Sequence, residues 1–372
     1  MYIHDIHSQI VDDEKVISGM LDDEKLWYKL PKEFGQDQLA DPFVAAALLV
    51  AMKAGESIKV DPKKPVSYKL LWGISLLQDL YSNWWPEFQP IEVECEVGKA
   101  APVQDGIASF FSGGVDSLYT FYRRQQLVTH LVFLGGVDVQ LDNEALYTEA
   151  LKSNRTFAKQ QEKTLIPVVT NLRDICHSKG ISWGSQFSGA GLSSVALLLG
   201  FPYALVPASQ AHEEHYPDAT SPALDHLFSN EATTIYYDGA VKRYVKIKEL
   251  GEIPSSLDRL RVCWQDNGYN CGKCEKCVRT MLLLKFFNLE CPTLPEFEGW
   301  QSMRKWRIES DVQKRIISSL IKVARETNNR RIRYQLIYLR RREAFKRWLA
   351  SIDRVYFSGS FKRMFKKVIG PA

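Results

Sequence analysis

The sequence lacks the features of a membrane-spanning or exported chain. Its longest uninterrupted apolar stretch, residues 43–52, is too short to cross a bilayer and is typical of a buried helix. Residues 1–14 are acidic and contain neither the basic segment nor the apolar core of a secretory signal. These absences predict a cytoplasmic protein with no transmembrane segment.

Internal repeats and low-complexity linkers are also missing. Cysteines are few and odd in number, seven in 372 residues, and four of them lie between positions 263 and 277. In a chain without an export signal, this clustering favours a metal site over disulfides. A hydrophobic fraction of 45% with 25% charged residues is typical of a globular protein with a buried core.

Acidic residues are scarce at the C-terminal end. Residues 301–372 hold 20 Lys and Arg against 5 Asp and Glu, which leaves 28 basic and 39 acidic residues in the rest of the chain. Helical spacing of apolar residues predicts a basic helical tail. The sequence leaves its role open among a solvated cap, a nucleic-acid or anionic membrane contact, an acidic partner protein, and a homo-oligomer contact.

The middle of the chain alternates short apolar runs with amphipathic segments. The pattern predicts strands 107–111, 131–134, 165–170 and 203–206 and helices 117–126, 143–161 and 191–199. We therefore expect an α/β fold whose doubly wound, mostly parallel sheet binds ligands at the carboxyl ends of its strands.

The N-terminal residues 1–100 predict a small α+β region. Helices are expected at 41–53 and 67–81, and a half-buried strand at 91–97, where apolar and acidic residues alternate. The expected organisation is therefore this region, a central ligand-binding domain at 101–300 and the basic tail at 301–372.

A serine- and glycine-rich hexapeptide, Ser112-Gly113-Gly114-Val115-Asp116-Ser117, follows the first α/β strand and opens a helix. Unpaired N–H groups and the helix dipole suit this position to anions, and the glycines let backbone approach a phosphate. Ser112 and Ser117 offer hydroxyls to phosphate oxygens, and Asp116 is suited to the Mg²⁺ that accompanies a triphosphate. No lysine follows the glycines, which excludes a Walker loop.

The strand, hexapeptide and helix together resemble the PP-loop of the N-type ATP pyrophosphatase superfamily. In that superfamily ATP is cleaved between its α and β phosphates, and AMP is placed on a carboxylate, carbonyl or amide oxygen. The resemblance implies an adenine nucleotide alpha hydrolase-like fold in which further backbone contacts hold adenine and phosphates. The residues in question are Phe133, Leu134 and Gly135 for adenine and Gly189 and Gly191 for phosphate, with Asp138 and Lys159 as weaker candidates.

The cysteine cluster has the spacing Cys263-x7-Cys271-x2-Cys274-x2-Cys277. Four thiolates are the number that a closed, tetrahedral structural Zn²⁺ site requires, and the glycine-containing turn between them lets the sulfurs converge. An iron–sulfur cluster on the same ligands and independent buried cysteines are the alternatives.

The order of motifs resembles the 7-cyano-7-deazaguanine synthase family over roughly residues 105–290. That family carries a C-x8-C-x2-C-x2-C zinc site at the same place after its PP-loop. Tyr216-Pro217-Asp218 and the later Asp238-Gly239, followed by Arg243 and Lys246, look like its substrate-side segments. The resemblance implies that Tyr216, Asp218 and Arg243 lie near a nucleobase-like substrate.

The chain also departs from that family. Val115 stands where the family usually has glutamine, and the first cysteine gap is one residue shorter. Residues 1–100 and 301–372 have no counterpart there.

The family mechanism implies that a bound carboxylate attacks the α-phosphorus of ATP–Mg²⁺ and that ammonia or an amine captures the acyl-adenylate. The product would be an amide, which a true family member activates again and dehydrates to a nitrile. The implied enzyme is an AMP-forming C–N ligase. Its candidate catalytic residues, which would position and stabilise charge, are Ser112, Asp116, Ser117, Arg243 and Lys246.

Two other functions compete with this one. A tRNA-thiolating enzyme would need a reactive thiol, for which Cys176 beside His177 is the candidate, and would use the basic tail to bind tRNA. A non-catalytic nucleotide-binding module would instead use the tail to dock a partner. The identity of the acceptor does not follow from the sequence.

Overall fold

The computed structural model describes residues 1–137, 139–214, 216–265 and 268–357. The chain divides into two compact units, Met1–Tyr269 and Asn270–Ala372. We call them the N-terminal unit and the C-terminal unit.

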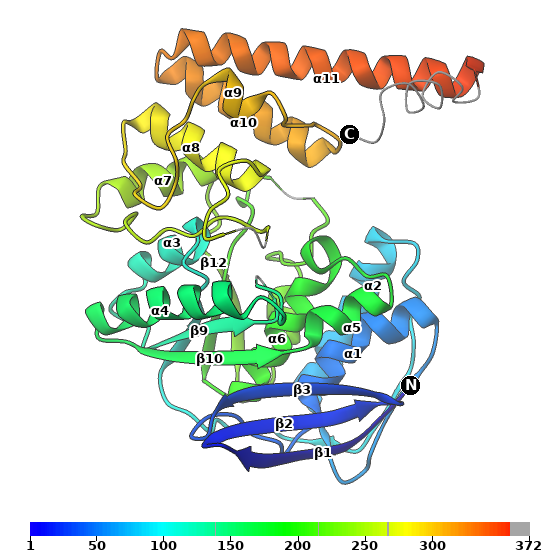
Figure 1. Ribbon diagram of the computed structural model, residues 1–372. Helices are drawn as coiled ribbons and strands as arrows, with labels where there is room; N and C mark the ends of the chain where they lie inside the picture. The colour runs from blue at the N-terminus through cyan, green and yellow to red at the C-terminus, as the bar shows by residue number, and fades with distance from the viewer. Residues whose placement is uncertain (138, 215, 266–267, 358–372) are drawn as a thin grey trace. The chain divides into compact units, whose positions relative to one another are not determined.

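A ten-stranded, mostly parallel sheet forms the centre of the N-terminal unit (Figure 1). Its strands, in spatial order, are β12 (Thr234–Asp238), β11 (Tyr203–Pro207), β8 (Ile107–Phe110), β9 (His130–Gly135), β10 (Thr164–Thr170), β3 (Glu24–Pro31), β2 (Glu14–Leu21), β1 (Tyr2–Val11), β4 (Ile58–Val60) and β6 (Val93–Glu94). The five strands from β12 to β10 pair in parallel. The predicted α/β class and its parallel strands are therefore confirmed.

Helices follow the strands as the alternation predicts. In the N-terminal unit they are α1 (Asp41–Ala54), α2 (Tyr68–Trp84), α3 (Val115–Arg123), α4 (Glu144–Gln160), α5 (Leu172–Ser178), the π-helical turn η1 (Trp183–Phe187), α6 (Ser188–Leu199), the 3-10 turn η2 (Asp225–Phe228) and α7 (Arg243–Gly251). Right-handed crossovers place α3 and α4 on one face of the sheet and α6 on the other. On the first face Phe111 stacks on Phe157, with ring centroids 4.7 Å apart, and on the second α6 packs along α1.

Residues 2–31 form an antiparallel meander that the sequence interpretation did not anticipate. Asp12, Asp13 and Asp22 adopt positive φ at its two tight turns, which suits the right-handed twist of hairpins. β3 then pairs antiparallel with β10, with Thr170 opposite Tyr28. The N-terminal strands therefore extend the same sheet that carries the α/β strands.

The single strand predicted at 91–97 is wrong as one element. Side-chain exposure does alternate along it, but the chain splits into β6, which pairs with β4, and β7 (Val97–Gly98), which pairs with β5 (Val66–Ser67). The split occurs because the carbonyl of Glu96 accepts the N–H of Val66, which turns the backbone toward a second, two-stranded sheet.

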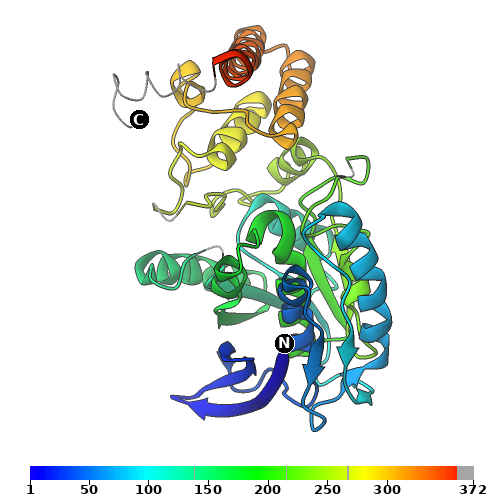
Figure 2. The ribbon, with the colours of Figure 1, turned by 90° about the vertical axis from the view of Figure 1, so that its right-hand side faces the viewer.

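The described part of the C-terminal unit is helical, as the basic tail predicts. Its helices are α8 (Glu275–Phe287), α9 (Trp300–Met303), α10 (Asp311–Glu326) and α11 (Arg330–Phe357). A capping box of Ser310 and Gln313 starts α10, and both views show α10 and α11 side by side (Figures 1 and 2). Among the described helices, none combines the length and apolarity that a bilayer span requires.

Candidate functional site

The carboxyl ends of β8 and β11 meet where the strand order reverses. From β8 the chain proceeds through β9 and β10 on one side, and then returns to β11 and β12 on the other. The register places Ser109 of β8 opposite Leu205 of β11. In open α/β sheets, ligands bind in the crevice at such a switch point.

The hexapeptide 112–117 lies at this switch point, between β8 and α3. Gly113 has φ +74°, a left-handed conformation that favours glycine, and Gly114 is the extended N-cap of α3. The helix therefore begins at Val115, two residues before the predicted start. The Ser117 hydroxyl donates to the Gly114 carbonyl at 3.1 Å, while Ser112 is half-buried beside the glycines.

Two cationic side chains converge on Asp116 from the first turn of α7. Arg243 donates from Nη1 to Oδ2 of Asp116 at 2.8 Å, and Lys246 donates from Nζ to Oδ1 at 2.7 Å. Lys246 is 1% exposed and also donates to the carbonyl of Ala208, just past β11, at 2.6 Å. One carboxylate thus holds two cations against the N-terminus of α3, which leaves net positive charge beside the loop.

A third cation, Arg261, was not among the residues predicted from the sequence. Its backbone N–H donates to the Gly113 carbonyl at 2.9 Å, and its side chain is 4% exposed. Nε and Nη2 of Arg261 are buried and have no hydrogen-bond partner among the described residues. Buried guanidinium groups are normally paired, so these N–H groups mark Arg261 as a candidate anion ligand.

A cleft of about 330 Å³ opens beside Gly113, between α3 and α4. The buried amide of Asn154 lines it, and Nδ2 of Asn154 has no hydrogen-bond partner in the part of the chain that the structure describes. The other lining residues are Phe111, Leu118, Tyr122, Phe157, Gln160, Gln161, Pro254, Ser255, Ser256, Asp258 and Arg259.

The end of β9 reaches the same edge of the sheet as the hexapeptide. β8 ends at Phe110, opposite Val132, so the last three residues of β9, Phe133, Leu134 and Gly135, extend beyond it. All three are buried, and a side-chain carbon on Gly135 would lie 2.6 Å from the ring of Tyr147. Their backbone lies at the edge where adenine was expected, while their side chains pack inside.

Gly189 and Gly191 lie in the first turn of α6 and are buried. A side-chain carbon on Gly189 would lie 2.0 Å from the carbonyl oxygen of Ala219, and one on Gly191 would lie 2.7 Å from the ring of Trp183. The π-helical turn runs directly into α6, because the N–H of Ser188 bonds to the carbonyl of Trp183. Both glycines therefore allow close packing, and their predicted contact with phosphate stays a prediction.

The predicted substrate-side residues follow β11. Asp218 accepts hydrogen bonds from Gln210 Nε2 at 2.7 Å and from its neighbour's N–H at 3.0 Å, and Tyr216 is half-buried. The N–H of Gln210 in turn donates to the hydroxyl of Tyr237, at the end of β12, at 2.8 Å. Burial raises the pKa of Tyr237, so its hydroxyl stays protonated. These residues form a polar network at the carboxyl ends of β11 and β12.

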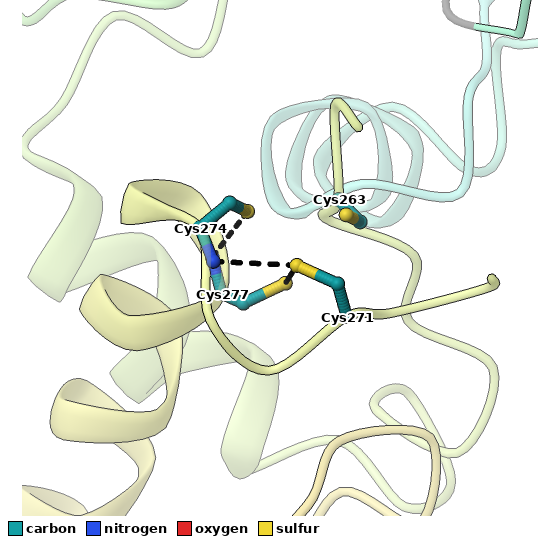
Figure 3. Close-up of side chains that lie close together, drawn as sticks. All are labelled: Cys263, Cys271, Cys274 and Cys277. Atoms are coloured by element: carbon teal, nitrogen blue, oxygen red, sulfur yellow. Dashed lines mark hydrogen bonds between the residues drawn. The ribbon is translucent and has the colours of Figure 1, made fainter. Parts of the chain in front are cut away.

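The four cysteines of the predicted metal site come together (Figure 3). The sulfurs of Cys263, Cys271, Cys274 and Cys277 all lie within 4.8 Å of one another, and three of the four side chains are buried. The sulfurs of Cys271 and Cys277 are 4.0 Å apart, far longer than a disulfide bond. This group could hold a metal ion.

Backbone N–H groups surround these sulfurs. The N–H groups of Lys273 and Cys274 point to Cys271 Sγ at 3.4 and 3.2 Å, and that of Cys277 points to Cys274 Sγ at 3.5 Å. Cys274 is also the N-cap of α8, so the helix dipole favours negative charge on its sulfur. Both effects stabilise thiolates, the form in which cysteine binds metals.

The remaining candidates fall outside this arrangement. Cys176 is 0% exposed, and burial raises the pKa of its thiol to about 12, so it is not a thiolate at neutral pH. Lys159 is exposed in the last turn of α4, and Asp138 lies outside the described residues.

No protein-family model, curated protein or solved structure matches the chain. Its candidate functions therefore rest on the residues themselves.

Proposed function

We propose that this protein is an ATP-dependent, AMP-forming enzyme that activates a carboxylate or carbonyl on a small, nucleobase-like substrate for attack by ammonia or an amine. The observation that carries the proposal is the cluster at the switch point. There, a helix N-terminus without a side-chain cap, a glycine-rich loop, the paired cations Arg243 and Lys246 and the backbone of Arg261 lie at the carboxyl end of β8. The sequence resemblance to PP-loop enzymes points to the same loop.

The residues fit a polyphosphate. The N–H groups at the start of α3 would bind phosphate oxygens, and Arg261 would contribute two N–H groups that are otherwise buried without partners. Arg243 and Lys246 would stabilise the negative charge that develops when the bond between the α and β phosphates breaks. Bound ATP would supply the AMP group that turns the acceptor's oxygen into a leaving group.

Asp116 has two candidate roles. Both of its oxygens are occupied by Arg243 and Lys246, so its first role is to hold these cations in place. Binding Mg²⁺ through Asp116, as the resemblance implies, would require one of these ion pairs to give way. The carboxylate is 26% exposed and therefore accessible to an ion.

For the cysteine cluster we propose a structural Zn²⁺. A tetrahedral ion with Zn–S bonds of about 2.3 Å places its sulfurs about 3.8 Å apart, close to the separations in the cluster. Four protein thiolates leave no open coordination position, so the ion would stabilise the fold and take no part in the reaction.

The acceptor would bind in the crevice beside the loop. The polar network of Asp218, Gln210 and Tyr237 lies there, at the carboxyl ends of β11 and β12. A carboxylate, an amide and a phenol hydroxyl are the kinds of group that hydrogen-bond the edge of a planar heterocycle. Binding there would place an acceptor close to Arg243, at the start of α7. 7-Carboxy-7-deazaguanine is the first acceptor to test, because the resembled family acts on it.

Equilibrium binding of ATP and turnover with a panel of carboxylate acceptors, Mg²⁺ and ammonia would test the proposal. Arg261→Gln should weaken ATP binding by about tenfold or more, since one charge-assisted contact is worth about 1.5–3 kcal/mol. Arg123→Gln is the matched control. Arg123 is exposed at the C-terminal end of α3, about 12 Å along the helix axis from the N-terminus where phosphate would bind.

If Arg261→Gln and Arg123→Gln lose ATP affinity equally, the support for a phosphate site at Arg261 is removed. ATP binding without AMP formation for any acceptor would favour the non-catalytic module instead. Cys176 offers no support for the thiolation hypothesis, because it is buried and protonated.

A further inference from the structure

Helix α11 has one buried apolar face and a second face with exposed aromatic side chains, of which Tyr338 also contacts the ring of Trp300. Ile332, Leu336 and Leu339 recur at helical spacing and are buried, and α11 packs along α10. These side chains account for the association of the two helices, which lie side by side in both views (Figures 1 and 2).

The opposite face of α11 is exposed and aromatic. Tyr334, Tyr338, Phe345 and Trp348 are 68%, 58%, 59% and 54% exposed, and Leu349 beside them is 46% exposed. The rings of Phe345 and Trp348 stack with centroids 5.7 Å apart. We call these five residues the aromatic face. Exposed aromatic side chains that recur on one helix face mark an interaction site, whereas scattered exposed side chains do not.

Basic residues lie beside and within the aromatic face. In residues 330–353 there are eight Arg and Lys against two acidic residues, Glu343 and Asp353. Glu343 pairs with Arg342 and Lys346, while Arg331, Arg340 and Arg341 are exposed. The positive charge around the aromatic face is therefore largely uncompensated within the helix.

The sequence that follows has the same chemistry. Residues 358–372 contain Phe361, Phe365 and four Lys and Arg, and no acidic residue. Aromatic and basic residues therefore continue as far as Lys367.

We infer that the aromatic face docks this protein on an anionic lipid bilayer, with α11 lying in the plane of the interface. Tyr, Trp and Phe prefer the headgroup level of a bilayer, and bordering arginines and lysines reach lipid phosphates with their long side chains. The helix is about 40 Å long, enough to bury all five apolar side chains at once. The inference is independent of the proposed catalytic function.

The shape of the surface favours a membrane over nucleic acid. Single-stranded nucleic acids stack their bases on aromatics set in a basic groove. Here the aromatics lie along a convex helix in two groups, Tyr334 with Tyr338 and Phe345 with Trp348, and Arg341 lies between the groups. Phosphates could pair with the arginines, but would leave the exposed aromatic rings in water.

Co-sedimentation of the full chain with vesicles tests the inference. We expect binding to vesicles of phosphatidylcholine with phosphatidylglycerol, weak binding to phosphatidylcholine alone, and a loss of affinity as salt increases. The triple variant Tyr338→Ser, Phe345→Ser, Trp348→Ser should bind anionic vesicles at least tenfold more weakly. All three positions are exposed, although Tyr338 also contacts the ring of Trp300, so circular dichroism and the thermal midpoint check that the variant keeps its fold.

Two further variants separate the contributions of the aromatic face and of the arginines to vesicle binding. Tyr68→Ser with Trp72→Ser is the matched control, because these residues of α2 are 66% and 63% exposed outside the aromatic face, and its binding should be unchanged. Arg340→Gln with Arg341→Gln should reduce both the affinity for anionic vesicles and its dependence on salt.

Four results would overturn the inference. They are no vesicle binding, equal loss in the triple variant and its control, tighter binding of single-stranded RNA than of anionic vesicles, and a dimer in solution that the triple variant converts to monomer. The last would assign the aromatic face to a second copy of the chain.

Discussion

Replacing Asp225 by asparagine should change how the stability of the protein depends on pH. Asp225 begins η2 and is 0% exposed. Its Oδ1 accepts the N–H of Ser221 at 3.0 Å, but its Oδ2 is buried with no hydrogen-bond partner among the described residues. Burial raises the pKa of this carboxyl to about 8, and the charge of Asp218 adds to the effect, while the Ser221 N–H opposes it.

The direction of the effect follows from linkage. An unfolded aspartate has a pKa of about 3.9, so the folded state binds the proton more tightly. The contribution of Asp225 to stability is therefore complete below about pH 4 and is lost as the pH rises toward 8, at about 1.4 kcal/mol per pH unit. Between pH 5 and pH 8 the native chain should lose about 3–4 kcal/mol through this one group.

Asparagine resembles the protonated acid in shape, can keep the Ser221 hydrogen bond and cannot ionise. The free energies of unfolding of both chains would be measured in urea at pH 5, 6, 7 and 8, with circular dichroism as the signal. The value for Asp225→Asn minus that for the native chain should increase by about 3–4 kcal/mol from pH 5 to pH 8. Asp41→Asn is the control. Asp41 is equally buried, and burial raises its pKa as well, but its two oxygens accept the Ser67 N–H and the Asn230 amide. Asp41→Asn should therefore destabilise the chain already at pH 5, where Asp225→Asn should not.

Parallel pH curves for Asp225→Asn and the native chain would refute the reasoning. They would mean that the Asp225 carboxyl is ionised and paired in the folded protein. The conclusion that Oδ2 is buried without a hydrogen-bond partner would then be wrong.

Three further predictions concern the loop, the packing and the metal. Asp116→Ala should lower the rate of AMP formation by about 10²-fold or more, because Arg243 and Lys246 lose their anchor; a rate within threefold of native would contradict this. Gly189→Ala should cost about 1–3 kcal/mol of unfolding free energy, because its new carbon would meet a carbonyl oxygen, whereas Gly184→Ala has open space and should leave the thermal midpoint unchanged. Elemental analysis should find one zinc per chain and none in Cys277→Ser, whose thermal midpoint should fall; iron with labile sulfide would instead indicate a cluster.

Much of the α/β region could be predicted because its signals are local. The strand-and-helix alternation and the hexapeptide are readable from adjacent residues, and the helix after Gly114 begins within two residues of the expected position. The cysteine spacing also sufficed, since residues 271–277 form a tight turn that brings three sulfurs together.

The N-terminal meander was missed although its signal is present. Asp12-Asp13 and Asp22-Asp23 each stand between alternating segments, which is a hairpin pattern.

Other parts could not have been read from the sequence. Asp116 and Lys246 are 130 positions apart, and they meet only because β11 returns beside β8. Arg261 looks no different from Arg259 in the sequence, and only the fold buries its side chain and brings its backbone beside Gly113. Long-range pairing of this kind depends on strand order, which local patterns do not specify.

The products of ATP turnover test the central claim most directly. The native chain, ATP, Mg²⁺, ammonia and 7-carboxy-7-deazaguanine or another carboxylate acceptor from the panel would be followed by ³¹P NMR, with Asp116→Ala in parallel. The account predicts AMP and pyrophosphate in equal amounts, formed by the variant about 10²-fold or more slowly than by the native chain. ADP and phosphate as the products, or AMP formed equally by the variant, would contradict it.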